Sequence, residues 1–153
     1  MRRELLLVAA LALPLSGVAT VALSDEAGAA AVTITCTSLS GSATGTVTLS
    51  GCTGGNTGGT SVPVSSAILA NGGVVPWVSG SSTTFGKPVL VSTSAKKCPG
   101  YVKGGTSNPS ALKANSPVTA DTGNGIKVPG TAKGTICITS AGSVSALGPF
   151  KIK

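Results

Sequence analysis

The chain has 153 residues and is basic, with 11 lysines and arginines against 4 acids, and it contains no histidine. Without histidine there is no imidazole for general-base catalysis, and the most common nitrogen ligand of metal sites is absent. Aromatic residues make up only 3% of the chain, whereas glycine and proline recur throughout, a composition that favours short strands separated by turns.

The N-terminal segment has the pattern of a secretory signal peptide. Two arginines precede an almost wholly apolar stretch over residues 5–23, and Ala27-Gly28-Ala29 supplies small residues for cleavage. A retained membrane anchor is the alternative, but Pro14 and Gly17 interrupt the stretch. We therefore predict that residues 1–30 are removed, that residues 31–153 form one domain without a transmembrane segment, and that the protein is extracellular or bound to the cell envelope.

Removal of this segment would leave nine lysines against a single acid, Asp121, a net charge of +8. Such an excess favours anionic partners, for which a cell-wall polymer or a lipid surface is the candidate. Specific recognition of nucleic acid is not expected, because arginine is absent from residues 31–153 and stacking aromatics are few. However, the lysines are scattered along the sequence, with no run longer than Lys96-Lys97, which favours the interpretation that they keep a glycine-rich β protein soluble and guard its edges.

The first predicted element is a β-hairpin. Apolar and hydroxyl side chains alternate over residues 32–36 and again over residues 46–50, which is the period of a half-buried strand. Residues 40–45 between them are rich in glycine, serine and threonine and predict the turn.

Four cysteines, Cys36, Cys52, Cys98 and Cys137, predict two disulfides in a small exported domain. Three pairings are possible, and we favour Cys36 with Cys52, which bracket the hairpin, and Cys98 with Cys137. Cys52 lies on the opposite face of its predicted strand from Val47 and Leu49, so this pairing requires a bulge at Gly51; otherwise the pairing differs. Metal binding is not expected, because there is no Cys-x-x-Cys pair.

The remaining elements are also predicted to be strands. A glycine-rich loop over 53–60 precedes strands at 62–69, 74–78, 83–85 and 88–93, the last two around a Gly86-Lys87 turn, and a short strand at 101–103. A long loop is expected over 104–125, with weak strands near Leu112 and Val118, and strands follow at 132–139, 143–147 and 150–152. No apolar repeat has helical spacing. The fold class is therefore all-β, an antiparallel β-sandwich or a small β-barrel stabilised by two disulfides.

Asp121-Thr122-Gly123 matches the signature of aspartic proteases, whose retroviral type contributes one aspartate from each small β subunit. However, the preceding Val118-Thr119-Ala120 is a poor hydrophobic strand. In addition, Asp121-Thr122-Gly123-Asn124 is an ordinary turn sequence. A dimeric hydrolase that uses Asp121 is therefore a remote alternative, and we expect a protein that is not an enzyme.

Ligand-binding candidates are few. Trp77 and Tyr101 are candidates for a small sugar-stacking platform, and Lys96 and Lys97 are further ligand-binding candidates. For Trp77 we favour a position in the core, because valines flank it.

The succession of ITCTSLSG, GTVTLSGCTGGNTGG, AKKCPG and GTICIT resembles a group of small secreted four-cysteine proteins of actinobacteria. The resemblance covers essentially all of residues 31–153, and it implies an exported β-rich domain without assigning functional residues. Together, these patterns predict a non-catalytic binding or structural domain that needs no cofactor. A carrier of hydrophobic ligands, with a cavity between its sheets, is the alternative.

Overall fold

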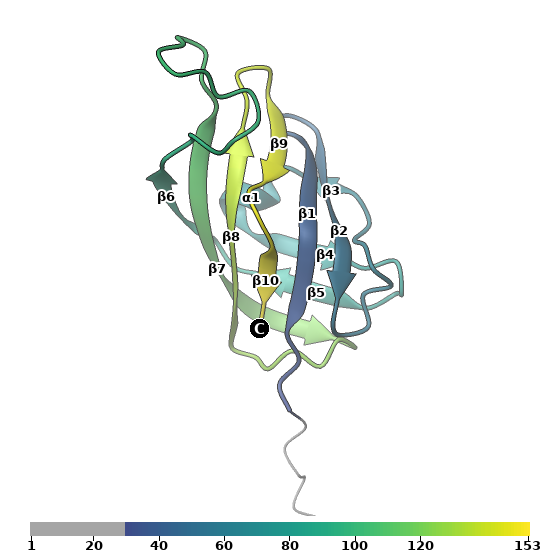
Figure 1. Ribbon diagram of the computed structural model, residues 1–153. Helices are drawn as coiled ribbons and strands as arrows, with labels where there is room; N and C mark the ends of the chain where they lie inside the picture. Colours follow the sequence, from purple (N-terminus) through teal and green to yellow (C-terminus); the bar gives the residue numbers. More distant parts are fainter. Residues whose placement is uncertain (1–29) are drawn as a thin grey trace, which may run out of the picture.

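The computed structural model describes residues 30–153, so the predicted signal peptide lies outside the described residues apart from Ala30. The described residues form ten strands and one short helix (Figure 1). The elements are β1 (Ile34–Ser42), β2 (Thr46–Thr53), β3 (Val64–Ser65), α1 (Ile68–Asn71), β4 (Gly73–Pro76), β5 (Ser82–Phe85), β6 (Val89–Thr93), β7 (Ser110–Thr122), β8 (Gly130–Ile138), β9 (Ser143–Ala146) and β10 (Phe150–Ile152). The prediction of an all-β antiparallel fold with two disulfides is confirmed.

The strands form one antiparallel sheet in the order β3-β2-β1-β10-β8-β7-β5-β4. Strand β6 also pairs with β7, and β9 pairs with both β1 and β8. The sheet curls until its two ends are bridged by residues 60–62. The Ser61 amide donates to the Leu49 carbonyl of β2 at 2.9 Å, and the Val62 amide donates to the Pro76 carbonyl of β4 at 2.8 Å. These bonds close the sheet into a barrel-like shape with one interior.

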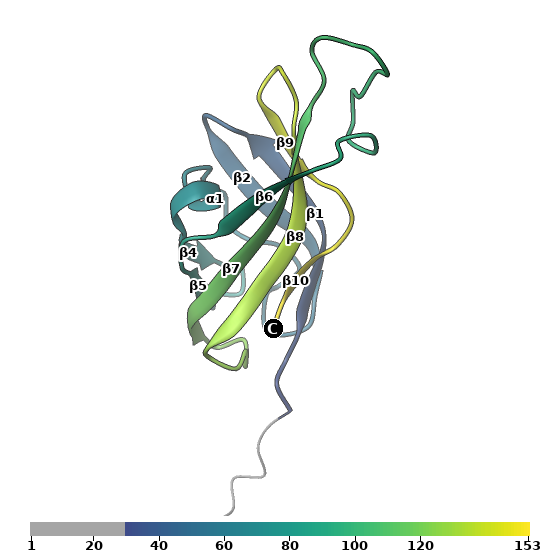
Figure 2. The same cartoon turned by 90° about the vertical axis from the view of Figure 1, so that its left-hand side faces the viewer.

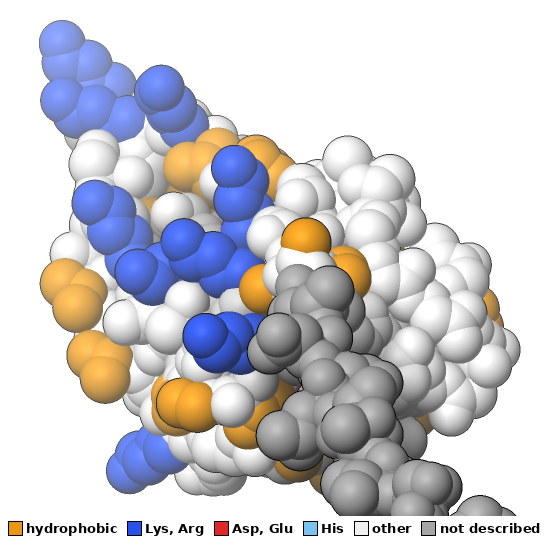
Figure 3. Space-filling model, turned by 90° about the horizontal axis from the view of Figure 1, so that it is seen from below, with side chains coloured by type: hydrophobic (Ala, Val, Ile, Leu, Met, Phe, Trp, Pro, Cys, Tyr) orange, Lys and Arg blue, Asp and Glu red, His pale blue; other side chains and the backbone are white. Residues whose placement is uncertain are grey.

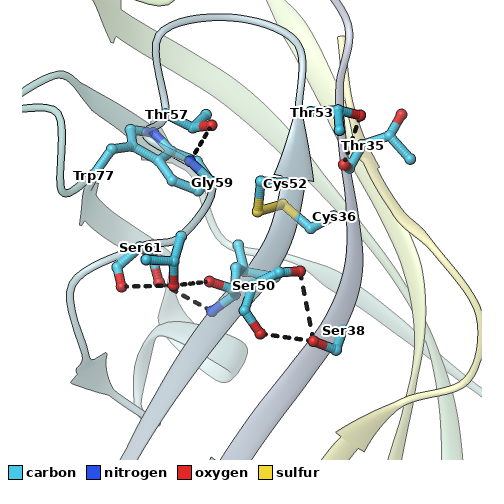
Figure 4. Close-up of a disulfide and its surroundings, with 12 residues drawn as sticks. Thr35, Cys36, Ser38, Ser50, Cys52, Thr53, Thr57, Gly59, Ser61 and Trp77 are labelled. Atoms are coloured by element: carbon cyan, nitrogen blue, oxygen red, sulfur yellow. Dashed lines mark hydrogen bonds between the residues drawn. A yellow bond between two sulfur atoms is a disulfide. The ribbon is translucent and has the colours of Figure 1, made fainter.

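The β1–β2 hairpin contains the first predicted disulfide, Cys36–Cys52 (Figure 4). The two cysteines are direct cross-strand partners, and the register is unbroken from Thr35↔Thr53 to Gly41↔Val47. The predicted bulge is therefore wrong, because no residue is inserted. Instead, both strands change their inward face at the same level: β1 buries Cys36 and then Leu39, and β2 buries Leu49 and then Cys52.

Gly51 lies at this change of face and has a φ of 61°. A Cβ atom at this position would lie 2.1 Å from the Thr37 hydroxyl oxygen of the facing strand. Only glycine fits this left-handed conformation without a clash, so Gly51 lets β2 turn Cys52 inward although it inserts no residue.

Several predicted segments differ in the structure. Residues 83–85 and 88–93 do not form a hairpin around Gly86-Lys87: β5 and β6 follow one another along the same neighbour, β7. The segment 62–69 contains only the two-residue β3 and the start of α1, and residues 101–103 belong to the loop between β6 and β7.

The largest error concerns residues 104–125, for which the sequence predicts a long loop with only weak strands near Leu112 and Val118. These residues contain β7, whose 13 residues make it the longest strand, paired with β8 over nine residue pairs. Its inward side chains include Ala114 and Ser116, so the strand lacks the strong alternation of large apolar residues that would reveal it in the sequence.

The interior of the closed sheet is filled mainly by aliphatic and aromatic side chains. The buried residues of this main core are Ile34, Cys36, Leu39, Val47, Leu49, Cys52, Val75, Trp77, Phe85, Ala114, Val118, Ile126, Ala132, Ile136, Val144, Phe150 and Ile152. Phe150 packs against Gly134 of β8, where an added Cβ atom would lie 2.1 Å from the ring. The absence of a side chain at Gly134 therefore makes room for one of the two phenylalanines.

A second, smaller cluster contains Cys98, Ala111 and Cys137, with Ala95 and Leu147 packed against it. The disulfide Cys98–Cys137 ties the loop between β6 and β7, which extends past the end of the sheet (Figures 1 and 2), to β8. Cys137 and its neighbour Ile136 point to opposite sides of β8, so this cluster lies outside the main core.

We predict that Cys98→Ala/Cys137→Ala releases the loop while the closed sheet stays folded. Trypsin should then cleave after Lys96, Lys97 or Lys103 at least about tenfold faster, because these lysines lie in the released loop. Limited proteolysis with mass spectrometry measures this.

The matched variant is Cys36→Ala/Cys52→Ala, which removes the bridge inside the main core. Its cysteines are 16 residues apart, so the chain-entropy estimate is a loss of about 3 kcal/mol from the unfolding free energy of the whole domain. Faster cleavage in the loop by the same factor in both variants would contradict the separation of the two clusters.

Candidate functional site

The structure separates the four residues predicted to bind a ligand. Trp77 is only 1% exposed and lies in the main core, where its indole N–H donates to the Thr83 hydroxyl at 3.0 Å. The core position favoured for Trp77 is therefore confirmed, and the sugar-stacking alternative is corrected, because a buried ring presents no face to a ligand. Tyr101 is half-buried, and Lys96 and Lys97 are exposed, all three in the loop that the Cys98–Cys137 disulfide holds.

Asp121, the candidate catalytic acid, is the acceptor at the centre of a polar network. Its Oδ1 accepts from the Thr83 hydroxyl and from the Asn124 side-chain amide, both at 3.0 Å. Its Oδ2 accepts from the backbone amides of Asn124 at 3.1 Å and Ile126 at 3.2 Å. Four neutral donors therefore hold the carboxylate, which fixes the turn that follows β7.

The network continues beneath the turn. Asn124 is buried, and its side-chain oxygen accepts a hydrogen bond from the Ser81 hydroxyl at 2.9 Å. Ser81 in turn lies in the connection between β4 and β5. The network thus joins the end of β7 to the β4–β5 connection and, through Thr83, to the ring of Trp77.

We predict that Asp121→Ala lowers the free energy of unfolding by at least about 2 kcal/mol, because it leaves buried donors without their acceptor. Urea unfolding followed by the fluorescence of Trp77, the single tryptophan, measures the loss. Thr122→Ala is the control: Thr122 is exposed, and we expect a change within about 0.5 kcal/mol. Equal effects of the two substitutions would contradict a structural role for the Asp121 network.

An open groove of about 650 Å³ lies over the outer face of β6, β7, β8 and β10. Its lining contains four exposed lysines, Lys113, Lys133, Lys151 and Lys153, which we call the groove lysines. The sheet register brings them together: Lys133 is the direct partner of Lys151, and Lys153 exchanges backbone bonds with Thr131. Lys113 pairs with Thr135, two residues along β8 from Lys133.

Lysine side chains gather on one side of the described residues in the view of Figure 3. In the view from below, blue lysine side chains gather on the left half and none is visible on the right (Figure 3). The sequence has the same asymmetry, because residues 30–86 carry no charged side chain and all nine lysines follow. With Asp121 held in its turn, no acidic side chain lines the groove.

The rest of the groove lining is neutral, and among the described residues that line it none is aromatic. Asn115, Thr131 and Thr135 supply polar groups, and Val89 and Val91 of β6 supply an apolar margin that is 63% and 55% exposed. Such a surface attracts anions by charge and offers no ring on which a base or a sugar can stack.

The interior also contains a cavity of about 50 Å³ beneath α1, lined mainly by apolar side chains such as Leu49, Ile68 and Phe85. Pockets for small organic ligands are about 300–1,000 Å³. The cavity is therefore too small for the ligand that a hydrophobic-ligand carrier would hold.

Comparison with known proteins adds no relative. Nothing matched the chain among protein families, curated proteins or solved structures. Among residues 30–153, no helix is long and apolar enough to cross a membrane, and no three histidine, cysteine or acidic residues are grouped so that they can hold a metal ion.

Sequence reasoning missed the groove because it expected only a weak strand near Lys113 within a long loop and treated the lysines as scattered charges that keep the protein soluble. Two signals were available in the sequence. One was the absence of charge from residues 30–86, and the other was the spacing of Lys151 and Lys153, which places both on one face of a strand.

Proposed function

We propose that the protein is a secreted or envelope-associated, non-catalytic binding domain whose lysine groove holds an anionic partner. The observation that carries the proposal is the convergence of the four groove lysines from three strands onto one open surface without an acidic neighbour. A chain that needed lysines only for solubility would gain nothing from gathering four of them on one half of the molecule, since like charges repel.

The proposed location outside the cell rests on two further observations. Both cysteine pairs are oxidised, and disulfides persist mainly in exported proteins. Residues 1–30 also have the pattern of a signal peptide, and their removal would take away both arginines and three of the four acids. The exported chain would then carry its full lysine excess.

Two triple variants test whether the groove, rather than net charge, binds. Lys113→Gln/Lys133→Gln/Lys151→Gln removes three groove lysines, and Lys96→Gln/Lys97→Gln/Lys103→Gln removes three exposed loop lysines. Dextran sulfate and neutral dextran serve as the anionic and neutral polymers. At about 1 kcal/mol per lysine, the groove variant should bind dextran sulfate on the order of a hundredfold more weakly, and the loop variant within about threefold of the parent.

Binding is measured by titration at several salt concentrations, because screening weakens contacts between exposed charges. The parent protein should bind dextran sulfate more weakly as salt rises and should not bind dextran. Equal losses in the two triple variants would show that net charge suffices, and binding to both polymers alike would contradict an anionic partner. All six lysines are exposed, so both variants should keep the fold.

A further inference from the structure

We infer that the partner in the groove is a single linear polyanion, bound in an extended form along a diagonal line from Lys113 to Lys153. This inference rests on the proposed function and adds the shape of the ligand. It follows from where the strand register places each groove lysine on the outer face.

The four lysines follow one diagonal line across β7, β8 and β10. Lys113 on β7 is diagonal to Lys133 on β8, so their Cβ atoms are about 7–8 Å apart. Lys133 faces Lys151 on β10 directly, with Cβ atoms about 5 Å apart. Lys153 follows two residues after Lys151, just beyond β10, and its Cα atom is about 7 Å further along the chain. The line is continuous, and its ends are about 16 Å apart by strand spacing and rise.

A chain molecule with an anionic group every few ångströms fits this line. Each step along the line is short enough for consecutive or alternate anionic groups to meet successive ammonium groups. A compact anion meets at most the central pair, Lys133 and Lys151, because Lys113 and Lys153 lie at opposite ends of the line.

The shape of the surface favours a chain over a lipid bilayer. The lysines line a hollow of about 650 Å³ whose lining also includes Val89 and Val91 on β6 and Leu147 and Pro149 between β9 and β10. A flat layer of lipid headgroups cannot contact the bottom of a groove, whereas a linear polymer can lie along it.

The residue types describe the ligand further. Lysine ammonium groups act as point charges and lack the planar fork with which arginine grips one phosphate or carboxylate. The groove lining contains no ring for base stacking. The chemistry recognised is therefore the repeated negative charge of a flexible chain, with either phosphate or carboxylate as the anion.

Polyphosphate of increasing length tests the inference, with orthophosphate, tripolyphosphate and chains of about 15 and about 60 phosphates as probes. Affinity per chain should rise at least about a hundredfold from orthophosphate to the chain of about 15, because further contacts of one chain are intramolecular. The logarithm of the long-chain binding constant should fall with the logarithm of salt concentration with a slope of about −3, at about 0.7 per lysine. Polygalacturonate tests a carboxylate chain, and binding of either chain supports the inference.

Paired variants test the line itself. Lys113→Gln/Lys153→Gln removes the two ends and should weaken the chain of about 15 phosphates about tenfold or more, while tripolyphosphate binding changes less than about twofold. Lys133→Gln/Lys151→Gln should weaken both ligands. Lys96→Gln/Lys97→Gln removes the same charge from the loop and should affect neither ligand by more than about twofold.

The failures are distinguishable. Equal affinity for orthophosphate and for long chains would overturn the extended chain, and so would equal losses of affinity in the end and loop variants. In either case, groove-dependent binding of dextran sulfate would still support the proposed function. Binding to vesicles containing phosphatidylglycerol without binding to either soluble chain would also overturn the inference. Loss of all anion binding would remove both proposals.

Discussion

The register of the β7–β8 ladder is the constraint on which both the core and the groove depend. Nine residue pairs, from Ser110↔Ile138 to Val118↔Gly130, place Ala114 and Val118 inward and Lys113 outward. Successive side chains of a strand alternate between faces, so a slip of one residue would bury the lysine and expose the valine. The burial of the inner face therefore holds the cationic face in place. The pairing of β8 with β10 then positions Lys151, and Lys153 just after it, at the far side of the groove.

Residues 30–86 carry no charged side chain, and all nine lysines and Asp121 lie in residues 87–153. The uncharged half builds the first hairpin and the edge strands, and its hydroxyl groups support buried bonds such as that from Trp77 to Thr83. Asp121 is held by neutral donors at the end of β7. The only acid among residues 30–153 thus stabilises a turn, and the lysines of the groove have no acidic side chain beside them to neutralise their field.

Local sequence patterns were sufficient to predict a strand where its residues alternate in hydrophobicity and border a recognisable turn. The hairpin around residues 40–45 and the strand around Ile136 fit this description. The favoured cysteine pairing, one of three possible, is the one in the structure. Prediction underestimated β7, giving weak strands near Leu112 and Val118 instead of one long strand, because Ala114 and Ser116 occupy inward positions that elsewhere hold larger residues. It also failed at Gly86-Lys87, where a turn-like pair only interrupts two strands that continue along β7.

The sequence by itself determined the all-β class, the presence of two disulfides and the lysine excess, because alternation, cysteine count and charge can be read directly from the chain. Only the tertiary structure decided that Trp77 is buried and that Asp121 holds a turn. It alone also brought lysines up to 40 residues apart in the chain onto one line. The reason is that the pairing of distant strands sets these positions. Such pairing depends on the register of the whole closed sheet, which no single segment encodes.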